Sequence, residues 1–303
     1  MRTITTIDLG SNSFRVLIYD CLNHKTLDEY QEVVGMADGL VSTGVISDAA
    51  QQRVIDAIEY SSKEMGYDPS TAICVTTAAM RMADNAQEVL DTFESKTGAM
   101  FRIIDGKEEA RLTLLAIQYA LKREKIDSQK FILLDIGGGS TEIIVNTHKD
   151  YISHSFNFGI VTLTQKNYSQ DELNEYLELK KLEIKNFLLT LDINLDDYTF
   201  VATAGTPTTI AAIKLGQDFF HYDKDKVNGT KVDLNDLKEC LDIFYHSSDE
   251  EIRKLVGSGR VEFIEIGIYI YKAIFEVLQK EASIVLDDGL REGVAINQCL
   301  LRE

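Results

Sequence analysis

The sequence predicts an α/β protein made of two related halves, and two observations support this prediction. First, one pattern occurs twice: residues 7–13 and residues 134–140 both read apolar, Asp, apolar, Gly, two small residues, Ser. Each copy is flanked by β-branched and apolar residues, which favour strands. Second, both halves alternate strand-like and helix-like segments, which is typical of α/β domains. At 303 residues the chain is long enough for two such domains.

The elements of the first half follow from periodicity and capping. Strands are expected at 3–7, 14–19 and 27–34, and Ser47 or Asp48 is a suitable cap for the helix that follows. Further along we expect a short buried strand at 72–75, a helix that ends near 97 and a strand at 101–104. Residues 105–111 then open a helix with one apolar face.

The second half repeats this plan. Strands are expected within 131–146 and at 151–156, 199–202 and 283–286, and helices at about 171–191, 234–245 and 261–279, followed by a last helix. The helix at 261–279 is apolar nearly all round, so we expect it to be buried. The charged segment 122–130 marks the expected boundary between domains 1–124 and 125–303. The prediction allows the C-terminal helix 290–303 to pack back on the first domain.

Composition limits the class of protein. An apolar share of 45% and a charged share of 26% are ordinary for a soluble globular protein. There is no N-terminal signal pattern and no run that could span a bilayer, so we expect a cytoplasmic protein that does not bind membranes. The formal net charge of -18 argues against a nucleic-acid partner.

Cysteine and histidine spacing gives no metal or catalytic pattern. The four cysteines, Cys21, Cys74, Cys240 and Cys299, stand far apart without any CxxC pair, so we expect reduced thiols. His148 and His154 fall on the expected hairpin of the second half, with no zinc spacing and no Ser-His-Asp arrangement.

The two Asp-containing loops are interpreted as phosphate cradles. Glycine permits a backbone with positive φ and a close approach of a ligand to the amides, and Ser and Asn add donors. The phosphate contacts expected from these loops and from a third turn are Ser11, Asn12, Ser13, Gly137, Gly138, Gly139, Ser140, Thr141, Gly205 and Thr206. One such loop alone is commonly only a hairpin turn, and it is the duplication that favours a phosphorylated ligand.

Carboxylates beside the loops predict a divalent metal. Asp135 precedes the second loop and Glu142 follows it, so a tight hairpin would bring both side chains to one opening. Asp8 is the equivalent of Asp135 in the first half, although an Asp at a strand end is often only a cap. Oxygen ligands of this kind suit Mg²⁺, and only the second loop is followed by an acidic residue, so we expect the metal nearer that loop.

Six blocks of the chain resemble the exopolyphosphatase/guanosine pentaphosphate phosphohydrolase family of the actin, sugar-kinase and Hsp70 ATPase superfamily. They are 7–14, 77–81, 106–111, 135–142, 204–206 and 289–293, in the family's order. The resemblance implies two actin-like (ribonuclease H-like) domains with a central cleft. It implies a hydrolase that releases terminal phosphate from inorganic polyphosphate, converts guanosine pentaphosphate to tetraphosphate, or does both. Longer members carry extra C-terminal helical domains, so the chain resembles a short form.

The resemblance also implies roles for two further residues. It places the general base at Glu109, the second Glu of a Glu-Glu-Ala-Arg block, although a helix dipole alone favours acidic residues there. Arg81 ends the block 77–81 at an expected strand end, where its planar guanidinium could bind a phosphate. Arg291 and Glu292 are interpreted as a structural pair that fixes the last helix.

Two alternative hypotheses stay open. The duplicated cradle is common to ATP-dependent kinases and ATPases of the superfamily, although no adenosine-pocket block is evident and the Glu-Glu-Ala-Arg block is not a kinase feature. A non-catalytic sensor of guanosine tetraphosphate or pentaphosphate would keep the cradle but would not need Glu109. The preference between polyphosphate and guanosine pentaphosphate stays open, as does the oligomeric state, for which a homodimer is one candidate.

Overall fold

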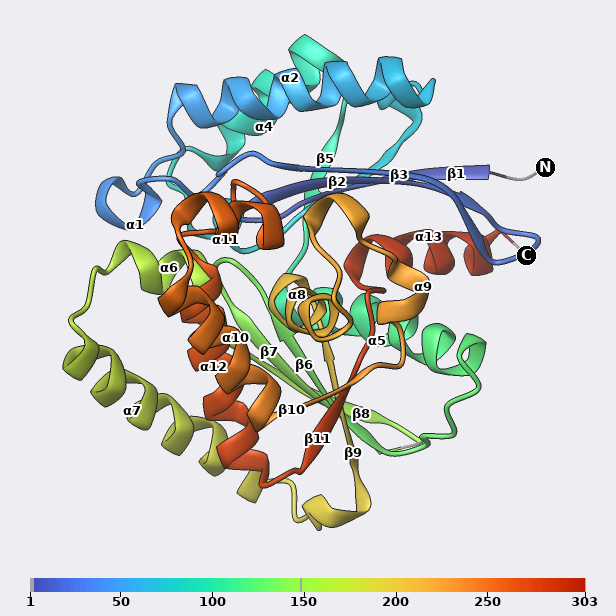
Figure 1. The fold of residues 1–303 in the computed structure, drawn as a ribbon. Coiled ribbons are helices and arrows are strands. Elements are labelled where there is room, and N and C mark those ends of the chain that lie inside the picture. The colour runs from blue at the N-terminus through green and yellow to red at the C-terminus, as the bar shows by residue number, and fades with distance from the viewer. Residues whose placement is uncertain (1–2, 148, 303) are drawn as a thin grey trace. The chain divides into compact units, whose positions relative to one another are not determined.

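The computed structural model describes residues 3–147 and 149–302, so His148 lies outside the described residues. The chain divides into two compact units (Figure 1). Unit 1 comprises Met1–Tyr119 and Asp288–Glu303, and unit 2 comprises Ala120–Asp287. Within the described ranges, no helix is both long and apolar enough to cross a membrane.

Unit 1 contains a five-stranded sheet in the order β3-β2-β1-β4-β5. Its strands are β1 (Thr3–Leu9), β2 (Ser13–Asp20), β3 (Lys25–Val33), β4 (Ile73–Thr76) and β5 (Phe101–Ile103). β1, β2 and β3 form an antiparallel meander, and β4 and β5 continue the sheet in parallel with β1.

Unit 2 repeats this topology in a six-stranded sheet, in the order β10-β11-β9-β6-β7-β8. Its strands are β6 (Phe131–Ile136), β7 (Thr141–Asn146), β8 (Tyr151–Phe156), β9 (Thr199–Thr203), β10 (Lys231–Asp233) and β11 (Ala282–Val285). β6, β7 and β8 form the meander, β9 and β11 are parallel to β6, and β10 is an added antiparallel edge. The α/β prediction and its two related halves are therefore confirmed.

The helices of unit 1 lie on both faces of its sheet (Figure 1). They are α1 (Leu40–Thr43), α2 (Asp48–Met65), α3 (Ala78–Met82), α4 (Ala86–Thr97), α5 (Gly106–Arg123) and α13 (Leu290–Leu301), with a 3-10 turn at Pro69–Thr71. Helix α5 carries the chain from unit 1 into unit 2. Helix α13 packs on β1 and β2 of unit 1 through a cluster of buried side chains that includes Leu17, Tyr19 and Ile296.

One helix of unit 2 packs against several of the others. The helices of this unit are α6 (Ile160–Gln165), α7 (Gln170–Leu189), α8 (Gly205–Lys214), α9 (Lys224–Val227), α10 (Leu234–His246), α11 (Asp249–Val256) and α12 (Ile264–Leu278), with 3-10 turns at Leu195–Asp197 and Phe219–His221. Helix α12 contacts α7, α8 and α10, and the rings of Tyr271 and Phe275 pack against Phe200 of β9. The burial predicted for the apolar segment 261–279 is thus observed.

The prediction of four reduced thiols is wrong for Cys21 and Cys299, which form a disulfide. Cys21 directly follows β2, Cys299 lies in the last turns of α13, and their Cα atoms are 5.3 Å apart. Since the two cysteines are 278 positions apart in sequence, it is the packing of α13 on β2 that brings their sulfurs together. Cys74 and Cys240 are buried thiols, as predicted.

Several elements differ from their predicted bounds. The helix expected to end near residue 97 is α4. The segment before it, expected to close a strand, forms the short helix α3, and Arg81 lies in α3 rather than at a strand end. Helices α1 and α9 are four residues long, too short to show a helical period in the sequence. Helix α11 was also missed, although Ser248 and Glu251 form a capping box at its start.

Candidate active site

The two Asp-containing loops have the same closure. In the first, the N–H of Gly10 donates to the carbonyl of Ser13 at 2.9 Å. In the second, the N–H of Gly137 donates to the carbonyl of Ser140, also at 2.9 Å. The duplication in the sequence is therefore also a duplication of hydrogen bonding.

The carbonyls of the second loop are anchored by the start of α6. The N–H of Ile160 donates to Gly137 O at 3.0 Å, and the N–H groups of Val161 and Thr162 donate to Gly138 O at 2.9 and 3.2 Å. A peptide unit is planar and trans, so its carbonyl and its N–H point in opposite directions. Anchoring these carbonyls therefore turns the N–H groups of Gly138 and Gly139 away from α6, and no acceptor for either is found among the described residues.

The first loop is anchored in the same way by the segment after β3. Ala37 N–H donates to Ser11 O at 2.8 Å, and the N–H groups of Val34 and Gly35 donate to Asn12 O at 2.9 and 3.0 Å. The N–H of Asn12 therefore points away from the segment after β3, as the N–H of Gly138 points away from α6. Both loops thus present backbone donors, the arrangement that binds anions such as phosphate.

The reason for glycine in these loops differs from the expectation. In the described part of the chain, positive φ occurs at other glycines and not at Gly10 or at residues 137–139. Close approach requires glycine in the second loop, where a Cβ on Gly137 would lie 2.9 Å from Ser140 O, whereas a Cβ on Gly10 would meet Ser13 O at an ordinary 3.6 Å. A Cβ on Gly159, just before α6, would lie 2.5 Å from Gly137 O. Sequence reasoning missed Gly159, because the contact spans 22 residues.

The residue opposite the aspartate differs between the two loops. In the β1–β2 register Asp8 pairs with Arg15, whereas in the β6–β7 register Asp135 pairs with Glu142. Directly paired residues project from the same face of a sheet, with Cβ atoms about 4.5–5.5 Å apart. At the first loop a carboxylate therefore faces a guanidinium across the strand pair, and at the second loop two carboxylates face each other.

Burial changes the ionisation of Asp8. Loss of solvent raises the pKa of its carboxyl to about 6, and the positive charges of Arg15 and Arg291 counteract that effect. Arg15 has a buried Nε, and within residues 3–147 and 149–302 no hydrogen-bond partner for it is found. An anion at the first loop could supply the missing acceptor.

The paired carboxylates of the second loop suit a hard cation. Glu142 is 2% exposed, and its Oε1 accepts a hydrogen bond from Ser155 Oγ at 2.6 Å. Two carboxylates facing each other at a strand pair repel, and a bound divalent ion with water ligands would relieve that repulsion. Across the described residues, no group of three or more His, Cys, Asp or Glu is arranged to hold a metal.

The third predicted phosphate turn begins α8. Ala204, just before it, has φ of 74°, an uncommon conformation for a residue with a Cβ. The guanidinium of Arg260 lies against Gly205, because a Cβ on Gly205 would be 3.6 Å from Arg260 Cζ. Arg260 Nη1 also donates to Thr209 Oγ1 at 3.2 Å. Sequence reasoning missed Arg260, although the Gly-Ser-Gly stretch before it marks a loop.

Some hydroxyls of the predicted phosphate contacts already have structural partners. Thr141 is fully buried and its Oγ1 donates to Phe158 O at 2.7 Å. Thr206 packs its side chain against Gly267 of α12, where a Cβ would lie 2.2 Å from Thr206 Oγ1. The hydroxyl of Thr141 is therefore engaged, and its strand pairs with β6 and β8. Thr206 lies in the first turn of α8, where the backbone N–H is the group available to a ligand.

The two predicted catalytic residues of unit 1 lie together. Arg81 Nη1 donates to Glu109 Oε2 at 2.8 Å and to the carbonyl of Ile104 at 2.8 Å. Both side chains are largely buried, with 24% of Arg81 and 12% of Glu109 exposed. The ion pair joins α3 to the first turn of α5, and it fixes the position of the Glu109 carboxylate.

The neighbouring Glu108 has a different set of partners. It forms a two-point ion pair with Arg111, at 2.9 and 3.1 Å, which holds the pKa of its carboxyl below the usual range. Arg291 pairs with Glu292 at 2.7 Å and with Glu29 of β3 at 2.8 Å, so the structure ties the start of α13 to the sheet.

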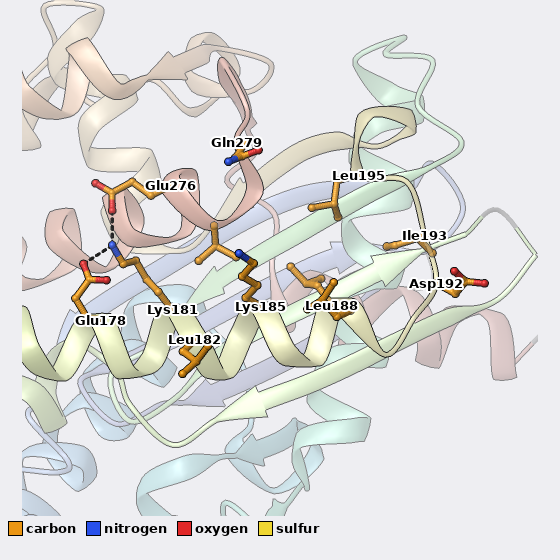
Figure 2. A pocket seen from close by; sticks show the side chains of 12 residues that line it. Glu178, Lys181, Leu182, Lys185, Leu188, Asp192, Ile193, Leu195, Glu276 and Gln279 are labelled. Carbon is orange, nitrogen blue, oxygen red and sulfur yellow. Dashed lines mark hydrogen bonds and ion pairs between the residues drawn. The ribbon is translucent and has the colours of Figure 1, made fainter.

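A pocket of about 530 Å³ lies elsewhere in unit 2 (Figure 2). It is formed by the second half of α7, the end of α12 and the segment after α7. None of the predicted site residues lines it, and the salt bridge between Lys181 and Glu276 crosses one end. This pocket is therefore separate from the phosphate loops.

Comparison with protein families supports the family resemblance found in the sequence. The family model described as "Ppx/GppA phosphatase family" matches residues 17–302. A guanosine-5'-triphosphate,3'-diphosphate pyrophosphatase from Aeromonas hydrophila is 28% identical over 300 residues, which is 95% of this chain and 58% of that protein. The chain thus spans a little over half the length of this relative.

Solved structures match over their full length. A family member from Aquifex aeolicus superposes with a TM-score of 0.75 and 27% identity, with coverage of 99% of this chain and 98% of that one. An exopolyphosphatase from Cytophaga hutchinsonii superposes with a TM-score of 0.83 and 22% identity, with 98% coverage of both. The predicted fold of two actin-like domains is confirmed.

Proposed function

This chain belongs to the Ppx/GppA phosphatase family, and on that premise we propose that it releases a terminal phosphate from a phosphoanhydride by attack of water. The proposed substrates are inorganic polyphosphate, guanosine pentaphosphate, or both. The names of the similar proteins include both activities.

One observation carries the proposal. In the second loop, two outward-turned backbone N–H groups stand beside a pair of opposed carboxylates. The N–H groups of Gly138 and Gly139 can bind phosphate oxygens, and Asp135 with Glu142 can hold a cation beside them. A phosphoanhydride with its counter-ion presents this combination of charges.

Magnesium is the proposed cofactor, held by Asp135 and Glu142. When bound, it would neutralise charge on the phosphate oxygens. The Ser155 hydroxyl orients the Glu142 carboxylate, which leaves the ligand geometry partly set before the ion binds.

Glu109 is the proposed general base. Its carboxylate would accept a proton from the attacking water, and Arg81 holds Oε2 in place through the 2.8 Å hydrogen bond. Arg81 has further N–H donors beyond Nη1, and these are available to a phosphate oxygen. The first loop, with the N–H of Asn12 and the Nε of Arg15, would hold phosphate oxygens by the same chemistry as the second.

The test compares four substrates under one condition. Phosphate release is measured from long polyphosphate, tripolyphosphate, guanosine pentaphosphate and ATP, with Mg²⁺ and again with excess chelator. We expect release from at least one of the first three, with loss of activity in chelator. Binding of guanosine tetraphosphate without any phosphate release would instead support a sensor, and preferential use of ATP would support the ATPase hypothesis.

A further inference from the structure

An exposed aromatic segment lies in unit 2 between α8 and α9 (Figure 1). It is the run Phe219–Tyr222, which begins with a 3-10 turn capped by Asp218. Asp218 Oδ1 accepts the N–H groups of Phe220 and His221 at 2.9 and 2.8 Å, so the backbone of the segment is well defined. Phe220 is 72% exposed, which is unusual for a phenylalanine in an ordered turn.

Tyr222 fixes one end of this segment to the phosphate turn. Its hydroxyl is hydrogen-bonded to the side chains of Thr208 and Asp287. The Thr208 hydroxyl also donates to Ala204 O at 2.9 Å, which is the residue directly before Gly205. The segment is thus connected to the start of α8 through two side chains.

Phe219 fixes the other end to the loop that carries Arg260. Its ring covers Gly257, where a Cβ would lie 2.8 Å from the ring, and Gly257 has φ of 84°. Three residues later, the guanidinium of Arg260 lies over Gly205. Phe219, before Phe220, and Tyr222, two residues after it, are therefore both anchored near the phosphate turn. Phe219 is anchored through the loop of Arg260, and Tyr222 through Thr208.

Phe220 itself has no comparable anchor. Its ring makes an edge contact with Phe219, with centroids 5.6 Å apart and planes at 82°. An exposed aromatic ring whose neighbours in sequence are anchored near the proposed phosphate turn is a suitable platform for a flat heterocycle.

We propose that Phe220 stacks on the purine base of a nucleoside polyphosphate whose phosphates lie at the Gly205–Thr206 turn. The inference rests on the proposed function and specifies its substrate: a guanosine nucleotide such as guanosine pentaphosphate rather than inorganic polyphosphate. Inorganic polyphosphate has no ring to stack, so it gains nothing from Phe220.

Charge favours a nucleotide over an acidic protein or a lipid surface as the ligand of this segment. The chain has a net charge of -18, which repels other anions except where a local cation faces them. Arg260 is such a cation, and it lies next to the turn that would receive the phosphates. A nucleotide combines a compact anion with an aromatic base, and this segment offers a partner to each.

The kinetic test uses the variant Phe220→Ala. Stacking on one aromatic side chain is worth about a 5- to 150-fold change in affinity. We therefore expect the ratio of kcat/KM for guanosine pentaphosphate to that for tripolyphosphate to fall by about 10-fold, mainly through KM. The matched control is Tyr60→Ala, an exposed ring of α2 (56% exposed) with one aromatic neighbour, which should leave the ratio unchanged.

A spectroscopic test does not depend on turnover. The chain contains no tryptophan, so Phe220→Trp introduces a single indole at the proposed platform. Guanosine tetraphosphate should quench its fluorescence in a saturable manner, and tripolyphosphate at the same concentration should not.

The outcomes separate this inference from the proposed function. Phosphate release with an unchanged substrate ratio in Phe220→Ala, or equal quenching by both anions, would overturn the stacking site and leave the hydrolase intact. Saturable quenching by guanosine tetraphosphate alone, in a protein that hydrolyses none of the substrates, would support the base site and overturn the hydrolase.

Discussion

Gly159 offers a direct test of how the second loop is built, through the substitution Gly159→Ala. Its backbone is extended, with φ of -153°, so alanine adds no backbone strain. The new Cβ would instead lie 2.5 Å from Gly137 O and 2.6 Å from the carbonyl carbon and oxygen of Gly138. These are backbone atoms, so the loop or the start of α6 has to move.

The expected cost has two parts. Overpacking of this kind destabilises a protein by about 1–3 kcal/mol, which at roughly 2–4 °C per kcal/mol lowers Tm by several degrees. The displacement also turns the N–H groups of Gly138 and Gly139, and a shift of about 1 Å in a positioned group can cost roughly 100-fold in rate. We therefore expect kcat/KM to fall by about 100-fold while the protein remains folded.

The matched control is Gly216→Ala, just after α8. Gly216 has φ of 70°, and a Cβ added there would meet no atom within 4 Å, so alanine costs about 1–2 kcal/mol through backbone strain alone. Thermal unfolding and phosphate release are measured for both variants. We expect similar losses of stability but loss of activity only in Gly159→Ala. Near wild-type activity of Gly159→Ala would refute the role of α6 in turning the loop amides.

Three further predictions address the metal site, the disulfide and Asp8. Asp135→Asn removes one of the two opposed carboxylates and should raise the Mg²⁺ concentration for half-maximal phosphate release by at least ~10-fold; an unchanged requirement would contradict the assignment. Thiol titration of the unfolded chain should find two thiols without reductant and four with it, and finding four in both cases would contradict the bond between Cys21 and Cys299. The pKa of Asp8 rises from 3.8 to about 6, so its ionisation destabilises the native state by roughly 3 kcal/mol as the pH rises through this range. In urea unfolding without divalent cations, Asp8→Asn should therefore be more stable than wild type at about pH 7.5 and similar to it at about pH 4, and equal stability at both would contradict the effect of burial.

Much of the fold could be predicted because its signals are local and repeated. The strand, Gly-containing loop and strand pattern occurs in both halves, and both loops close with the same hydrogen bond, at Gly10 and at Gly137. The seven-residue separation of Asp135 and Glu142 is short enough for a hairpin register to follow from the sequence.

The features that sequence reasoning missed depend on contacts between distant segments. The disulfide joins Cys21 to Cys299 only because α13 returns to the sheet of unit 1. Gly159 reveals its role only when α6 lies against the second loop, and Arg260 only when its loop covers Gly205. None of these contacts has a periodicity or a motif that a single sequence would show.

The central claim, that the chain is a hydrolase with Glu109 as its base, is tested most directly by Glu109→Gln. Glutamine can accept the same hydrogen bond from Arg81, so the fold and the binding of guanosine tetraphosphate should be retained. The loss of a proton acceptor should lower kcat for phosphate release by about 100- to 10,000-fold. A variant that binds normally and releases phosphate at close to the wild-type rate would contradict the claim.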